Sequence, residues 1–222
     1  MSSLITITGP IATGATTLAK RLIEVMSWES LIETDVEKAN AFFPLYSTDP
    51  PRYAFHNQVA FLANSAESHQ SLRTSLSSKK IYVQDFCPFE HTEVYAYVQH
   101  AQGYLSHEEY TLLLRLTEII EPYYRVPDVL LYRPLSPQRL LQRIQERGRK
   151  SEQSADFGFL DALRDRFEEW IGGWTRSPVI RVDEHTDFLT DADAVSHLGT
   201  AIAAQRKTKR PSSYRRKAIT ND

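Results

Sequence analysis

Residues 4–22 read LITITGPIATGATTLAKRL, and this segment gives the clearest indication of the fold. Residues 4–8 are β-branched and apolar, which predicts a buried strand. Two glycines then interrupt the chain, and Leu18, Leu22 and Met26 follow at intervals of four, which predicts a helix over residues 16–26. A glycine turn between a strand and a helix is where a phosphate-binding loop lies.

The glycine turn, residues 9–17, has the chemistry that such a loop needs. Glycines let backbone N–H groups turn inward around phosphate oxygens, and the N-terminus of the following helix adds positive potential. Thr16 stands where the loop hydroxyl holds Mg²⁺. The usual pattern is G-x-x-x-x-G-K-[ST], however, and Ala15 occupies the lysine position. A degenerate glycine turn without a ligand stays open as the alternative.

The rest of the chain repeats this alternation of strand and helix. Strands are predicted at residues 28–33, 80–85, 128–132 and 179–182, and helices at 36–45, 52–76, 92–102, 106–123, 138–146, 157–171 and 192–204. Residues 47–51, STDPP, are predicted as a loop. Ser106 and Glu109 predict a capping box at a helix start. The alternation predicts an α/β fold, a five-stranded parallel sheet flanked by helices on both faces.

Two regions differ in composition. Residues 1–205 are predicted to form one domain, whereas residues 206–222 are predicted to be a basic, disordered tail. We interpret the tail as a solvated chain end, with weak binding of acidic partners as the alternative. The net charge of −2 does not favour nucleic acid as the main partner. The single cysteine, Cys87, excludes a disulfide framework and suits a reducing compartment. With no membrane-length apolar run and no signal-like N-terminus, we expect a cytoplasmic protein.

A basic segment follows the strand predicted at 128–132. Arg143 and Arg147 are four apart and share a helix face, and Gly148 then places Arg149 beside them. Three guanidinium groups suit an anionic ligand, because each can make paired hydrogen bonds to phosphate oxygens. The alternative is a solvated helix end paired with Glu146 and Glu152.

Two acids stand at the carboxyl ends of predicted strands, the edge where open α/β sheets bind ligands. Asp85 is a candidate Mg²⁺ contact, and Glu33 is a candidate base for an attacking hydroxyl. Gln58 lies among apolar residues of its helix and would satisfy its amide on a base edge or on a loop carbonyl. The histidines at 56, 69, 91, 100 and 107 are expected at the surface, and Trp170 and Trp174 in the core.

Taken together, these residues resemble the deoxynucleoside kinases, and among them the bacterial deoxyadenosine/deoxyguanosine kinases. The resemblance is carried by GPIATGATTLAKRL (9–22), PLYSTDPPRYAFHNQVAFL (44–62) and LQRIQERGRKSEQ (141–153). It implies a P-loop kinase fold with an arginine-bearing lid, and a homodimer or a heterodimer with a related subunit. It also implies ATP-dependent phosphorylation of the 5′-hydroxyl of a purine deoxynucleoside, with Mg²⁺.

The resemblance also assigns roles to individual positions. The donor phosphates would be bound by Gly9, Ile11, Ala12, Thr13, Gly14, Ala15, Thr16 and Thr17. Asp187 and Phe188 would lie against the donor adenine, and Glu33 would be the general base. The transferring phosphoryl group would be held by Arg143, Arg147 and Arg149. The nucleoside would be contacted by Gln58, Tyr46, Phe86 and Glu152, and Mg²⁺ by Thr16 and Asp85.

Three positions depart from the family pattern in a way that removes positive charge. Ala15 replaces the loop lysine, Phe86 replaces an arginine, and Ser65 replaces a second arginine. Removing one group that stabilises developing charge costs about 10²–10³ in rate. The alternative function is therefore a nucleotide-binding subunit without phosphotransfer. A monophosphate kinase of thymidylate-kinase type ranks below both, and Ala15 is compatible with natural loss or with an inactivating substitution.

Overall fold

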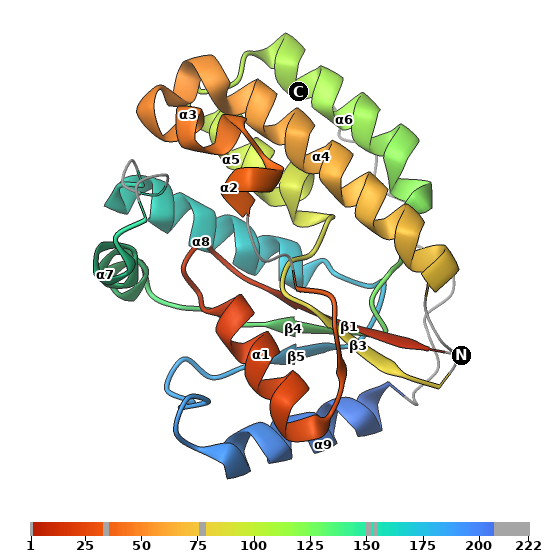
Figure 1. The fold of residues 1–222 in the computed structure, drawn as a ribbon. Coiled ribbons are helices and arrows are strands. Elements are labelled where there is room, and N and C mark those ends of the chain that lie inside the picture. Colours follow the sequence, from red (N-terminus) through yellow and green to blue (C-terminus); the bar gives the residue numbers. More distant parts are fainter. Residues whose placement is uncertain (1, 33–35, 76–78, 150–151, 153–154, 207–222) are drawn as a thin grey trace.

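The computed structural model describes residues 2–32, 36–75, 79–149, 152 and 155–206, which form a sheet between two layers of helices (Figure 1). All strand pairs are parallel, and the order is β2-β3-β1-β4-β5, so the predicted five-stranded parallel sheet is confirmed. The strands are β1 Ser3–Thr8, β2 Glu29–Ser30, β3 Ile81–Gln84, β4 Val129–Tyr132 and β5 Val179–Arg181.

The helices divide between the two faces of the sheet (Figure 1). Helices α1 and α9 cover one face, α4, α5 and α8 lie on the other, and α6 packs on the outer side of α4. The described helices are α1 Ala15–Met26, α2 Val36–Ala39, α3 Phe42–Thr48, α4 Pro50–Ser75, α5 Tyr97–Ala101, α6 His107–Ile120, α7 Pro137–Arg147, α8 Phe157–Gly172 and α9 Ala192–Gln205. A π-helical turn, η1 (His91–Ala96), precedes α5, and a 3-10 turn, η2 (Glu121–Tyr123), follows α6. The capping box of Ser106 and Glu109 at the start of α6 is confirmed.

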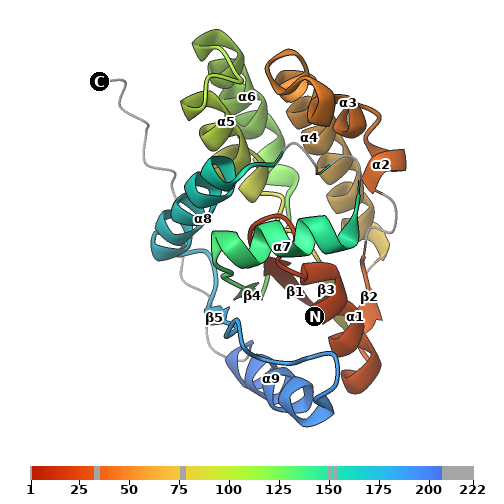
Figure 2. The ribbon, with the colours of Figure 1, turned by 90° about the vertical axis from the view of Figure 1, so that its left-hand side faces the viewer.

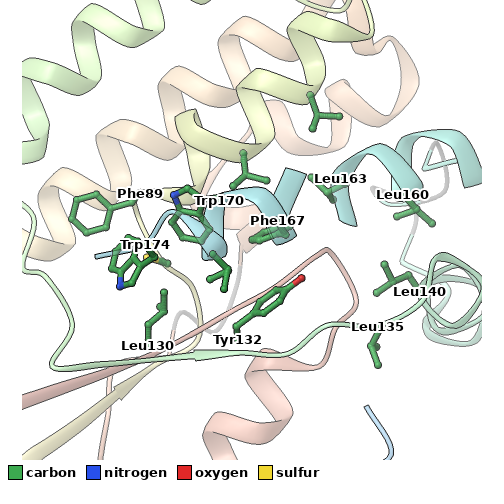
Figure 3. Packing of buried hydrophobic residues seen from close by; sticks show 14 of the residues in the cluster. Phe89, Leu130, Tyr132, Leu135, Leu140, Leu160, Leu163, Phe167, Trp170 and Trp174 are labelled. Carbon is green, nitrogen blue, oxygen red and sulfur yellow. The ribbon is translucent and has the colours of Figure 1, made fainter. Parts of the chain in front are cut away.

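Alternate residues of the strands supply the two cores. Ile5 and Ile7 of β1 pack with residues of α1 and α9 such as Leu22. Tyr132 of β4 packs on the opposite face, against Phe167 of α8 (Figure 3). Every residue of β4 is buried, as expected for a parallel sheet that is covered on both sides.

Local chemistry explains why the predicted loop at 47–51 is wrong. Ser47 and Thr48 are the last residues of α3, and α4 begins at Pro50. Proline is favoured in the first turn of a helix, because its missing N–H would have no partner there. The composition that predicts a loop therefore marks a tight junction between two helices.

Two other predicted elements are shorter or broken. The strand expected at 28–33 is reduced to Glu29–Ser30. The helix expected at 36–45 is interrupted at Asn40, whose side chain accepts from the N–H of Phe42 and donates to Asn57. Asparagine bonds that compete with helical ones in this way end helices.

The aromatic residues divide between confirmed and wrong predictions. Trp170 and Trp174 lie in the core as predicted (Figure 3). His69 and His91, expected at the surface, are buried. His69 Nδ1 accepts a hydrogen bond from the backbone N–H of Arg125, so this ring nitrogen has a partner although it is buried.

Candidate active site

A cavity of about 580 Å³ lies where the carboxyl ends of β1 and β3 meet α4 and α7. Helix α7 lies across this end of the sheet (Figure 2), the edge where open parallel sheets bind ligands. The predicted site residues that line the cavity are Gly9, Ile11, Ala12, Thr13, Gly14, Ala15, Thr16, Thr17, Tyr46, Gln58, Asp85, Phe86, Arg143, Arg147, Arg149 and Glu152. Asp187 and Phe188 do not line it, and Glu33 lies outside the described residues.

The two glycines of the loop are required by its geometry. Gly14 has φ 91° and is the N-cap residue of α1. A Cβ there would lie 2.9 Å from the Arg143 guanidinium, and a Cβ at Gly9 would lie 2.7 Å from the carbonyl oxygen of Arg133. Both positions therefore exclude other residues, and the loop approaches its neighbours as closely as a phosphate-binding turn must.

Beside the loop, a hydroxyl and a carboxylate from separate elements meet. Thr16 Oγ1, in the first turn of α1, donates to Asp85 Oδ2 at 2.6 Å. Asp85 directly follows β3, so the neighbouring strands β1 and β3 bring the two together. Oxygen ligands of this kind are those that Mg²⁺ accepts, so Thr16 and Asp85 are the residues that would hold this ion, and the ion would supply positive charge beside the loop.

The sequence predicted that the three lid arginines act together at one place, but the structure separates them into two groups. Arg143 Nε donates to the Ala12 carbonyl at 2.8 Å, which joins α7 to the loop. Arg147 and Arg149 instead both contact the carboxylate of Glu152, the latter at 2.8 Å. Glu152 is buried, so two guanidinium groups neutralise it. Of the three, Arg143 is the one on the phosphate loop.

At the far end from the loop, the cavity presents amides and aromatic rings. Gln58 Nε2 donates to Gln99 Oε1 at 2.9 Å, while Gln58 Oε1 is buried without a hydrogen-bond partner. Burial raises the pKa of Tyr46 to about 12, so its hydroxyl keeps its proton. A buried acceptor that lacks a partner costs stability, so this end suits a ligand that donates a hydrogen bond.

A comparison with protein families identifies the family to which a chain with this loop, lid and pair of amides belongs. The family model for deoxynucleoside kinases matches residues 5–205. The chain belongs to the deoxynucleoside kinase family. A deoxyadenosine/deoxycytidine kinase of Bacillus subtilis is 29% identical over 206 residues, covering 91% of this chain and 93% of that protein. A deoxyadenosine kinase of Lactobacillus acidophilus is 28% identical over 203 residues, covering 87% of this chain and 92% of that one.

Solved structures of the family show the same fold. A deoxyadenosine kinase of M. mycoides, solved with its products dCMP and dCDP bound, has a TM-score of 0.78 and 17% identity. The match covers 90% of this chain and 99% of that one. The P-loop kinase fold expected from the sequence is thereby confirmed.

In this member of the family, a neutral pair of side chains lines one wall of the amide end. Ser65 Oγ lies 3.1 Å from His91 Nε2, and the His91 ring stacks on Phe61 with ring centroids 5.0 Å apart. Burial lowers the pKa of His91 to about 4, so the ring is neutral at pH 7. Sequence reasoning missed His91, because a histidine at the start of a helix carries no pattern that indicates burial.

Glu90, which the sequence analysis also missed, lies at the boundary between the two ends. It accepts a short hydrogen bond from Thr8, the last residue of β1. Burial raises the pKa of Glu90 to about 8, so the carboxyl is protonated at pH 7. A protonated acid adds no negative charge beside the phosphate loop.

Arg133, directly after β4, lies on the side of the loop away from the cavity. It is buried, donates to the Thr13 carbonyl, and has its guanidinium 4.5 Å from the centre of the Phe188 ring. Phe188 thus packs behind the loop, and Asp187 caps its own turn by accepting from Leu189 and Thr190. An arginine that directly follows a predicted strand is a signal the sequence does contain.

No helix in the described ranges is both long and apolar enough to cross a membrane. The homodimer, or heterodimer with a related subunit, and the cytoplasmic location stay predictions. Of the predicted tail, residues 206–222, the structure describes Arg206, which is the C-cap residue of α9, and residues 207–222 lie outside the described ones.

Proposed function

We propose that this protein transfers the γ-phosphoryl group of ATP to the 5′-hydroxyl of a deoxynucleoside. The observation that carries the proposal is the cavity itself, which joins a phosphate loop at one end to the buried, unpartnered Gln58 Oε1 at the other. An anion fits the first end and an uncharged ring with a donor fits the second. Membership in the family supports the same assignment.

Each end has its own residues for the reaction. Backbone N–H groups of residues 9–17 bind the donor phosphates, and Arg143 stabilises charge on the transferring group. Thr16 and Asp85 hold Mg²⁺, which when bound offsets the negative charge of the phosphates. Glu33 is proposed as the base for the 5′-hydroxyl, although it lies outside the described residues.

For the acceptor we propose a purine deoxynucleoside, with deoxyadenosine first. Gln58 Oε1 can accept from the amino group of adenine, and Gln99 fixes the other half of the amide. The names of the relatives include deoxyadenosine, but also deoxycytidine, which carries an amino group too. Both nucleosides therefore belong in the test.

The alternative is a nucleotide-binding subunit without phosphotransfer, and two substitutions relative to the family pattern favour it. Ala15 puts a methyl group where the loop pattern has a lysine, and Phe86 puts a ring at the cavity wall where the family pattern has an arginine. Both changes remove positive charge that phosphoryl transfer uses.

A phosphotransfer assay separates the two functions. The chain and its Ala15→Lys variant are each given ATP, Mg²⁺ and one of the four common deoxynucleosides. Turnover by the unaltered chain supports the kinase, and the rates rank the substrates. Turnover by the lysine variant alone means that this chain is a binding subunit derived from a kinase. If neither turns over with any deoxynucleoside, the proposed reaction is wrong.

A further inference from the structure

The phosphate end carries more positive charge than the loop sequence indicates. Arg133 Nη1 would lie 3.3 Å, and Arg143 Nη2 2.9 Å, from a Cβ placed on Gly14. Gly14 immediately precedes Ala15, so two guanidinium groups flank the residue beside the missing lysine. Arg143 lines the cavity, whereas Arg133 is buried and is not among the residues that line it.

Arg133 is held in place by the loop on several sides. Thr13 Oγ1 donates to the Arg133 carbonyl at 2.6 Å, and the Arg133 N–H donates to the Thr8 carbonyl at 3.1 Å. Its guanidinium donates to the Thr13 carbonyl in return. These hydrogen bonds connect the end of β4 to Thr8, the last residue of β1, and to Thr13 within the loop.

The guanidinium of Arg133 has no ion-pair partner in the described chain; the nearby acid is Glu184, whose carbonyl Arg133 contacts at 3.4 Å. Among the described residues, no carboxylate lies within ion-pair distance of its guanidinium, and its Nε is buried without a hydrogen-bond partner. Burial and the nearby Arg143 and Arg139 lower its pKa to about 10, so it stays charged at pH 7. A buried charge without a partner is costly, and an anion on the other side of the loop would offset that cost.

The bond to Thr13 also sets the direction of a donor. The chain has no cis peptide in its described part, so the Thr13 carbonyl and the Gly14 N–H point in opposite directions. Because the carbonyl points to Arg133, behind the loop, the Gly14 N–H points away from Arg133. Arg133 thereby orients a donor of the loop as well as supplying charge.

We propose that Arg133 is a positioning residue that substitutes for the missing loop lysine by holding the Thr13–Gly14 peptide and placing a buried positive charge behind the phosphates of ATP. The inference rests on the proposed function for the identity of the ligand. It accounts for how a loop with Ala15 binds a triphosphate.

The test is a double-mutant cycle of Arg133→Gln and Ala15→Lys, read as the affinity for ATP with Mg²⁺ by calorimetry. Arg133→Gln should weaken ATP binding at least fivefold and change deoxyadenosine binding less than twofold, because deoxyadenosine has no phosphate. Adding Ala15→Lys to Arg133→Gln should recover most of the loss. Arg139→Gln, on an exposed arginine that contacts the Glu184 carbonyl as Arg133 does, should change ATP affinity less than twofold.

Three results would overturn the inference. They are a loss below fivefold in Arg133→Gln, an equal gain from Ala15→Lys in both backgrounds, or no binding of ATP by the unaltered chain. If Arg133→Gln shows no cooperative melting transition, it is not folded, and the inference is then tested with the Ala15→Lys variant alone. A gain in ATP affinity below tenfold supports the substitution by Arg133, and a gain of tenfold or more refutes it.

Failure of the inference is distinguishable from failure of the proposed function. Binding of ATP that depends on Arg133, without turnover in either protein, rejects the kinase reaction and keeps the role of Arg133. Turnover that Arg133→Gln leaves unchanged, together with unchanged ATP affinity, rejects only the inference.

Discussion

The two ends of the cavity differ in charge: the phosphate end carries arginines, and the polar side chains of the amide end are neutral. At the phosphate end, Arg133 and Arg143 carry charge without a carboxylate at ion-pair distance in the described chain. At the amide end, Gln58, Gln99 and His91 are uncharged, and a single acceptor is left over. The positive charge at the first end is complementary to the phosphates of a nucleotide, and the free acceptor at the second end is complementary to a donor on a nucleobase.

This difference indicates which substitutions the site can tolerate. Charge acts over several ångströms, so a guanidinium behind the loop can replace an ammonium in front of it. A hydrogen bond works only at contact distance and with the right direction. The phosphate end therefore accepts a change of architecture, such as Ala15, more readily than the amide end accepts a change at Gln58.

The largest effect should follow from Arg143→Ala, which breaks the phosphate end. Arg143 joins the lid to Ala12 of the loop, and an arginine that stabilises phosphoryl transfer is worth about 10³–10⁵ in rate. We expect kcat to fall about 10³-fold, with the KM for the deoxynucleoside changed less than threefold. Steady-state kinetics measures both, in whichever of the unaltered chain and Ala15→Lys turns over. Arg139→Ala, one turn earlier on α7 and exposed, is the control, and retention of a tenth of kcat in Arg143→Ala would contradict the assignment.

Gln58→Leu should break the amide end with a smaller effect. It removes the acceptor and leaves Gln99 Oε1 without its donor, a cost of about 1–3 kcal/mol. We expect kcat/KM for the deoxynucleoside to fall about 10- to 100-fold while the KM for ATP stays within twofold. Gln70→Leu, an exposed glutamine of the same helix, should change neither value. An equal rise in both KM values would mean that Gln58 supports the whole cavity and does not face a base.

The sequence predicted the phosphate end better than the amide end, for a physical reason. The loop is local, so its glycines, Thr16 and the following helix are read from adjacent residues, and Asp85 follows a strand that alternation reveals. Gln58 was found because it lies among apolar residues. His91 was missed because its partners, Ser65 and Phe61, come from another helix and are brought to it by tertiary packing.

Arg133 could have been predicted from the sequence by a rule that uses only its position after a strand. The rule that picked Asp85, a charged residue directly after a predicted strand, applies equally to Arg133, which follows β4. The arginines of the lid were instead predicted to act together, and their separation into Arg143 on the loop and two partners of Glu152 depends on a buried carboxylate. Burial of Glu152 is a property of the fold and has no signature in its neighbours.

The smallest effect concerns Glu90, at the boundary between the two ends, and it appears in stability. Burial raises the pKa of Glu90 to about 8, so the folded state keeps a proton that the unfolded state releases above pH 4.5. The stability that this proton provides is present below pH 4.5 and is lost as the pH rises through 8. The two buried histidines, with pKa values lowered to about 4, act in the opposite direction, and most of their effect falls between pH 4 and pH 6.5.

Between pH 6.5 and 8, the difference between the unaltered chain and Glu90→Gln isolates the contribution of Glu90, because both histidines are the same in the two proteins. The melting temperature of the unaltered chain should fall by a few degrees across that window, and that of Glu90→Gln should fall by less, because the amide mimics the protonated acid at every pH. Thermal melts at the two pH values measure the difference, with Glu118→Gln on the exposed side of α6 as the control. If Glu90→Gln keeps the full slope, the carboxylate is ionised in the folded protein. The boundary would then carry a negative charge beside the loop, and the contrast between a charged end and a neutral end would need to include it.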